Sequence, residues 1–88
     1  HDEELLFRAE ARRNKLLGLW AAGVMGKSGT EAADYAMQVV AADFEEAGDE
    51  DVYRKVAADL GDKADEKVIR AKMVELLIEA KRQVISEA

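Results

Sequence analysis

Apolar residues recur at intervals of three or four along most of the chain, which is the spacing of one face of an α-helix. The pattern falls into four segments, and a glycine or a helix-capping residue stands at each join. We therefore predict helices over residues 3–25, 29–47, 50–60 and 66–86. No segment of useful length alternates apolar and polar residues, so no strand is predicted.

Each predicted helix has one apolar stripe and cannot bury that stripe alone. The stripes are Leu6, Ala9, Leu16, Leu17, Trp20 and Val24; Ala33, Ala36, Met37, Val40, Phe44 and Ala47; Val52, Val56 and Leu60; and Ile69, Met73, Leu76, Leu77, Ala80 and Val84. The prediction is an all-α fold, a four-helix bundle with a long first helix and a long last helix. We expect residues 1–88 to form a single domain.

Polar residues at the joins are typical of helix starts. Ser28 and Glu31 have the spacing of a capping box for the second helix. Asp49 and Asp65 stand directly before the third and fourth helices, where a carboxylate can accept hydrogen bonds from free backbone amides.

Composition narrows the class of protein. Of 88 residues, 49% are hydrophobic and none is proline or cysteine, which fits packed helices and excludes a disulfide framework. The net charge of −6 argues against binding to nucleic acid or to anionic membranes. The longest nearly apolar run, residues 16–25, is much shorter than the ~20 residues that span a bilayer. We expect protein partners, no nucleic acid and no membrane insertion.

Candidate sites for small-molecule chemistry are weak. Gly26-Lys27-Ser28 resembles the end of a phosphate-binding loop, but Ala21 stands where that motif needs glycine. Carboxylates gather around Gly48, but they lack the spacing of a calcium loop and suit helix starts instead. We call this group the acidic cluster; it consists of Asp43, Glu45, Glu46, Asp49, Glu50 and Asp51. His1 and the serines form no catalytic arrangement, so we predict no enzyme, no metal and no cofactor.

The first predicted helix has two further faces besides the one that faces the core. Arg8, Arg12 and Lys15 form a basic stripe, and Phe7, Ala11, Asn14 and Gly18 share a third face. This third face either packs on another helix or contacts a partner. Arg13 points with the apolar face, where it should pair with a carboxylate of the acidic cluster or extend its guanidinium outward.

Two long blocks of sequence resemble one family. Residues 5–22 read LLFRAEARRNKLLGLWAA, residues 39–55 read VVAADFEEAGDEDVYRK, and a looser third block contains Ile69-Arg70, Met73 and Glu75-Leu76-Leu77. They resemble the zeta subunit of alphaproteobacterial F-type ATP synthases. The resemblance implies a four-helix bundle that inhibits ATP hydrolysis by inserting an N-terminal segment between catalytic subunits beside the central stalk. It also implies contact with the alpha, beta and gamma subunits, in the cytoplasm and peripheral to the inner membrane.

An inhibitor of this kind needs a helix that docks and a bundle that anchors it. Apolar side chains beside basic ones are well suited to binding in a groove on a partner protein. The predicted partner-binding residues are Leu5, Phe7, Arg8, Ala11, Arg12 and Asn14. We expect a monomer when free. The alternative is a stand-alone helical bundle that binds another protein or a nucleotide, the latter weakly through the Gly26-Lys27-Ser28 turn.

Family members carry an inhibitory segment ahead of the position that matches His1. We predict that the 88-residue chain inhibits ATP hydrolysis much less than a form extended by that segment. Because a few buried residues carry most of an interface's affinity, excess short chain should compete with the extended form and partly relieve its inhibition. ATP hydrolysis by purified synthase, with each form alone and with both, measures this. Equal inhibition by the two forms would place the inhibitory wedge within residues 5–14.

Overall fold

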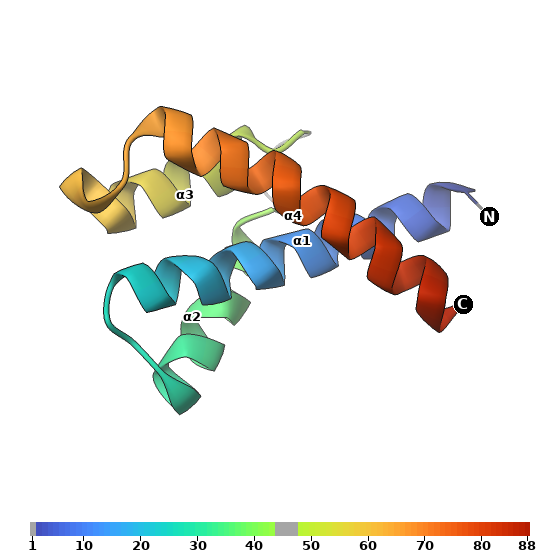
Figure 1. Cartoon of the computed structure of the whole chain (residues 1–88), viewed down its shortest axis with the longest axis horizontal. Coiled ribbons are helices and arrows are strands. Elements are labelled where there is room, and N and C mark those ends of the chain that lie inside the picture. Colours follow the sequence, from blue (N-terminus) through green and yellow to red (C-terminus); the bar gives the residue numbers. More distant parts are fainter. Residues whose placement is uncertain (1, 44–47) are drawn as a thin grey trace.

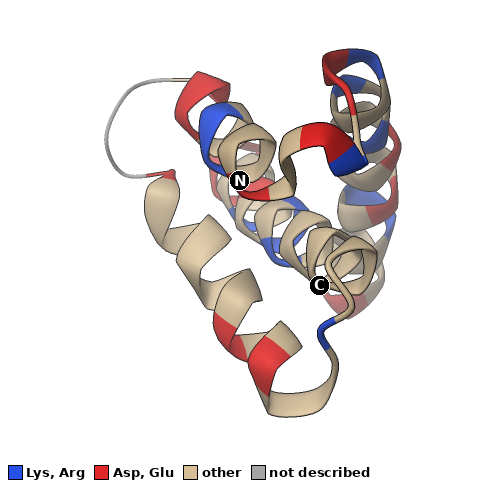
Figure 2. Ribbon diagram, turned by 90° about the vertical axis from the view of Figure 1, so that its left-hand side faces the viewer, with Lys and Arg blue, Asp and Glu red and all other residues tan. Residues whose placement is uncertain are grey.

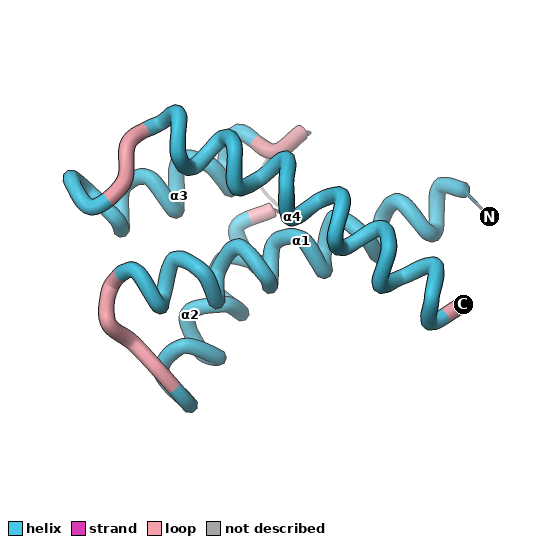
Figure 3. Tube along the Cα trace, in the orientation of Figure 1, coloured by secondary structure: helices cyan, strands magenta, loops and turns pink. Residues whose placement is uncertain are grey.

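The structure, a computed structural model, describes residues 2–43 and 48–88 of the chain. Its elements are α1 (Asp2–Val24), α2 (Gly29–Ala42), α3 (Glu50–Leu60), a short 3₁₀ helix η1 (Gly61–Lys63) and α4 (Glu66–Glu87). The described residues contain no strand, and the joins between α1 and α2 and between α3 and α4 are short (Figure 3). The predicted all-α fold with long first and last helices is confirmed.

Helix α1 lies between α2 and α4 (Figure 1). It runs antiparallel to α2 after a tight turn, and it crosses α4 near the middle of both helices. The N-terminus of α1 and the C-terminus of α4 lie at the same end of the molecule, beyond the reach of α2 and α3. α1 therefore has two sides covered over much of its length, whereas its first turns pack only on α4.

The core consists of one large cluster and one small one. The large cluster brings together Leu17, Ala21, Ala22, Ala32, Tyr35, Val39, Val52, Val56, Leu60, Ile69 and Met73 from all four helices. The small cluster joins the first half of α1 to the end of α4 through Ala9, Ala80 and Val84, with Leu5, Leu16 and Leu77 packed around them. The predicted core residues of α3 are all buried.

The predicted apolar stripe of α2 is rotated from the observed one. The buried residues are Ala32, Tyr35, Ala36 and Val39, whereas Ala33 and Met37 are exposed and Val40 is half-buried. Most positions of α2 are apolar, so the sequence pattern alone does not fix which side faces inward. The predicted stripe also included Phe44 and Ala47, which lie outside the described residues, and α2 ends at Ala42.

Six other predicted core positions are not fully buried: Leu6 is exposed, and Leu16, Trp20, Val24, Leu76 and Leu77 are half-buried. Leu6 is 45% exposed and lines an open hollow between α1 and the end of α4, with Lys81, Val84 and Ile85. Leu77 is only half-buried, at the edge of the small cluster. At the helix starts, the Asp65 carboxylate accepts a 2.9 Å hydrogen bond from the Val68 amide, as predicted. Ser28 and Asp49 occupy N-cap positions, but neither side chain makes a capping hydrogen bond.

Gly18 sets the distance between α1 and α2. A Cβ atom on this residue would lie 2.6 Å from the Ala36 Cα atom and 3.2 Å from the Val39 Cγ2 atom. Contacts this close to backbone are relieved only when one helix moves. The face predicted to contain Gly18 therefore packs on another helix, at least over this stretch.

We predict that Gly18→Ala lowers the free energy of unfolding by about 1–3 kcal/mol, because overpacking outweighs the higher helix propensity of alanine. Gly23→Ala is the matched control on the same helix, since a Cβ atom there meets nothing within 4 Å. The control should be neutral or stabilising by up to about 1 kcal/mol. Urea unfolding of both variants measures the difference, and equal stability of the two would contradict the close approach.

Candidate functional site

Most of the predicted partner-binding residues lie at the accessible end of α1. Phe7 is 66% exposed, Arg8 is exposed, and Leu5, Ala11 and Arg12 are half-buried. Asn14 is fully buried. In the folded bundle a partner can therefore touch the other five, but it cannot reach Asn14.

A shallow groove of about 350 Å³ runs along this part of α1. From α1 it is lined by Phe7, Arg8, Ala11, Arg12 and Lys15, and its other wall is formed by Met37 and Val40 of α2, with Val84 of α4 at one end. We call this the α1–α2 groove. The structure brings the predicted basic stripe together with Phe7 and Ala11, which the sequence placed on a separate face. Met37 and Val40 were predicted to lie in the core, and their place in the groove follows from the rotation of α2.

Arg12 already holds a carboxylate from the end of α4. Its Nη1 and Nη2 atoms donate to the two Glu87 carboxylate oxygens at 2.8 and 2.9 Å, and Nη1 also donates to Gln83 Oε1 at 2.7 Å. These hydrogen bonds raise the pKa of Arg12 and lower that of Glu87. Arg8 is close enough to Glu87 to lower the pKa of that carboxyl further, although it donates no hydrogen bond among the described residues.

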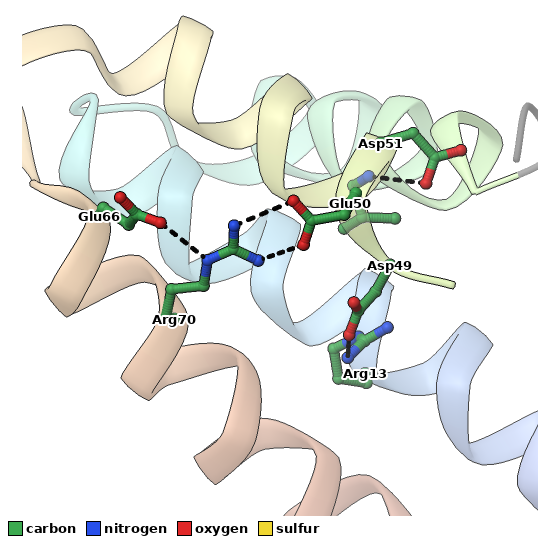
Figure 4. A network of polar contacts seen from close by, with 7 residues as sticks. Arg13, Asp49, Glu50, Asp51, Glu66 and Arg70 are labelled. Atoms are coloured by element: carbon green, nitrogen blue, oxygen red, sulfur yellow. Dashed lines mark hydrogen bonds and ion pairs between the residues drawn. The ribbon is translucent and has the colours of Figure 1, made fainter. Parts of the chain in front are cut away.

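Below the groove, Arg13 and Asn14 form a buried polar pair that anchors α1 to the start of α3. Arg13 is almost fully buried; its Nε atom donates to Asn14 Oδ1 at 2.7 Å, and its Nη1 atom lies 3.4 Å from Asp49 Oδ2 (Figure 4). The predicted pairing of Arg13 with the acidic cluster is confirmed. A guanidinium buried at this depth is costly without such partners, so the pair fixes the position of α1 against α3.

The pKa of Asp43, at the end of α2, is raised above its ordinary value, chiefly by burial. The Asn14 amide and the Arg13 guanidinium oppose the shift, whereas the negative charges of Asp51 and Asp49 add to it. Asp49 and Asp51 of the acidic cluster thus repel the negative charge of Asp43, and the buried Arg13 offsets part of this repulsion. This arrangement is structural, because Arg13 and Asn14 are shielded from solvent.

Arg70 ties α4 to α3. Its Nη1 and Nη2 atoms donate to the Glu50 carboxylate at 2.6 and 3.1 Å, and its Nε atom lies 3.4 Å from Glu66 Oε2 (Figure 4). Its guanidinium also stacks 3.7 Å above the Tyr53 ring. Glu50 therefore serves a structural role. Among residues 2–43 and 48–88, no three His, Asp or Glu side chains are placed to hold a metal ion.

The turn proposed for weak nucleotide binding lies at the opposite end of the molecule. There Lys27 borders a polar groove with Tyr35, Lys55 and Asp59. Tyr35 donates a 2.8 Å hydrogen bond to Asp59, and burial together with this bond raises the pKa of Tyr35. Lys55 also pairs with Asp59 at 2.8 Å, so Tyr35, Lys55 and Asp59 are engaged with one another. None of the described helices is both long and apolar enough to cross a bilayer.

The fold and the surface define a small all-α protein, a four-helix bundle that presents an apolar and basic groove on its first helix. A family model described as ATPase inhibitor subunit zeta matches residues 1–83, and the chain belongs to this family. It is 60% identical to a protein whose structure was solved by NMR in solution; the match covers 93% of this chain and 96% of that one, with a TM-score of 0.86. No curated protein matches the chain. The resemblance seen in the sequence is thereby confirmed.

The raised pKa of Asp43 predicts a pH-dependent stability. A carboxyl whose pKa is higher in the folded state stabilises the fold below its ordinary pKa of about 4, and this contribution is lost as the pH rises through the folded value. Asp43→Asn mimics the protonated form, so we expect the variant to be more stable than the parent at pH 7 and equally stable below about pH 4. Urea unfolding at both pH values tests this, with the exposed Asp34→Asn on the same helix as control. An equal change in both variants would show that burial of Asp43 is not the cause.

Proposed function

We propose that this chain inhibits ATP hydrolysis by an F-type ATP synthase, and that it does so by docking the first half of α1 on the catalytic sector. Membership of the ATPase inhibitor subunit zeta family supports the inhibitory role. The partners in this proposal are the alpha, beta and gamma subunits. The chain then works in the cytoplasm and is held near the inner membrane only through the synthase.

One observation carries the docking step: large exposed apolar side chains and the exposed Arg8 share the first half of α1. Phe7 and Leu6 are 66% and 45% exposed, and Arg8 lies beside them. Exposed apolar side chains next to arginine are typical of the centre of protein interfaces. Leu5, Phe7, Arg8, Ala11 and Arg12 are the proposed contacts, and Asn14 contributes by holding α1 in the bundle.

The mechanism requires no catalytic group in this chain. A rotary motor passes through states in which its catalytic interfaces open and close, and a protein that binds one of these states more tightly than the others stops the cycle there. The bundle supplies a rigid base, because the buried Arg13 and the close approach at Gly18 fix α1 against α3 and α2. A rigid docking helix loses less entropy on binding than a disordered one.

We predict that Arg8→Glu weakens binding to the purified catalytic sector by about tenfold, equivalent to ~1.4 kcal/mol. Arg8 is exposed and donates no hydrogen bond or ion pair within the described residues, so its reversal leaves the fold intact. Reversed charge should also slow association, because electrostatic attraction between unlike surfaces is lost. Biolayer interferometry and inhibition of ATP hydrolysis measure the two effects.

Lys63→Glu is the control, since it makes the same charge change on exposed η1. It should bind within about twofold of the parent, because most surface substitutions outside an interface have small effects. Equal weakening by both variants would mean that net charge, rather than contact at α1, controls binding.

A further inference from the structure

One wall of the α1–α2 groove contains an exposed apolar residue, Met37, that does not belong to the core of the bundle. Met37 is 59% exposed, while the inward face of α2 is supplied by other residues. With Phe7 across from it on α1, Met37 leaves a large apolar side chain on each side of the groove in contact with water. Exposed apolar patches of this kind mark binding sites more often than isolated exposed residues do.

The charged residues that line the groove are all basic, opposite in sign to the net charge of the chain, and Glu87 of α4 pairs with one of them, Arg12. The chain has a net charge of −6, yet Arg8, Arg12 and Lys15 all line this groove. The part of α2 that borders the groove carries no charge, and the acidic residues of α2 lie toward its other end (Figure 2). A groove with an apolar floor and a cationic rim complements an apolar segment that carries carboxylates.

The Glu87 contact shows that a carboxylate fits this rim. Arg12 binds it with two hydrogen bonds, at 2.8 and 2.9 Å, which is the geometry of strong guanidinium–carboxylate recognition. Arg8 and Lys15 are exposed and lie one turn to either side of Arg12. They remain available for carboxylates from another molecule.

We propose that the α1–α2 groove binds an acidic amphipathic segment of the catalytic sector, with an apolar side chain between Phe7 and Met37 and carboxylates on Arg8 and Lys15. This inference rests on the proposed function and extends it: the docking surface includes α2, and the partner segment has a defined chemistry. Grooves between two helices commonly receive one face of an amphipathic helix, whose apolar residues recur every three or four positions.

The test compares Met37→Glu, Met37→Lys and Ile78→Glu for binding to the purified catalytic sector. Met37→Glu places a negative charge against the partner's carboxylates and should weaken binding at least tenfold. Met37→Lys loses the same apolar contact but adds to the positive rim, so its loss should be at least threefold smaller. Ile78→Glu is the matched control, since Ile78 is 68% exposed on α4 and does not line this groove; it should bind within twofold of the parent.

The outcomes separate this inference from the proposed function. If the parent chain does not bind the catalytic sector, both the proposed function and the role of the groove are wrong. If Arg8→Glu weakens binding and Met37→Glu behaves like Ile78→Glu, docking through α1 stands and the groove is overturned. Equal losses in Met37→Glu and Met37→Lys would overturn the acidic partner. Binding to vesicles that contain anionic lipid, lost in the same variants, would replace the protein partner with a membrane.

The methionines give a second readout that does not depend on substitution. The chain has three, of which Met73 is buried in the core and Met25 lies at the far end of α1. In a chain labelled at the methionine methyl groups, adding the catalytic sector should shift the Met37 signal and leave the other two in place. A shift confined to Met25 would place the partner at the opposite end of the bundle and overturn the proposal.

Discussion

Helix α1 is packed on two sides at once, and the rest of the structure follows from how it meets that constraint. α2 packs on one side of α1 and α4 on the other. On each side, some positions of α1 must therefore be small so that the neighbouring helix can come close. Small residues, above all Gly18 against Ala36, allow α2 to approach closely, and Ala9 does the same for α4. Close approach gains dispersion contacts and removes apolar surface from water, which is how an 88-residue chain builds a sufficient core.

The same constraint leaves one region of α1 accessible to a partner. α2 is shorter than α1, so the first turns of α1 pack only on the end of α4 through a small apolar cluster and the Arg12–Glu87 contact. Farther along, the buried Arg13 pairs with Asp49 at the start of α3, at 3.4 Å. One half of the helix is therefore fixed by the core while the other half presents Phe7 and Arg8 to solvent. This division between an anchored half and a presented half suits an inhibitor that acts by docking.

Much of this architecture could be predicted from the sequence. The 3.6-residue spacing predicted the four helices and the core residues of α3, and the aspartate directly before the last helix predicted the cap at Asp65. These features were predictable because they depend on local signals. The ion pair of Arg13 was one of two alternatives predicted from the sequence, because a guanidinium on an apolar face needs a carboxylate or must extend to solvent.

The rest depends on contacts between distant parts of the chain. Apolar residues cover more than half of the circumference of α2, so the pattern did not fix which part faces inward and misplaced Met37. In the structure Ala36 packs against Gly18. Leu6 was assigned to the core because periodicity does not reveal how completely a neighbouring helix covers each position. Asn14 was predicted to contact a partner, yet it is enclosed beside Arg13.

Hydrogen–deuterium exchange of the chain, free and bound to the catalytic sector, tests the central claim most directly. The account predicts slower exchange on binding at residues 5–15 and 37–40 and no change in α3. Faster exchange along all of α1, or protection confined to α3, would contradict it.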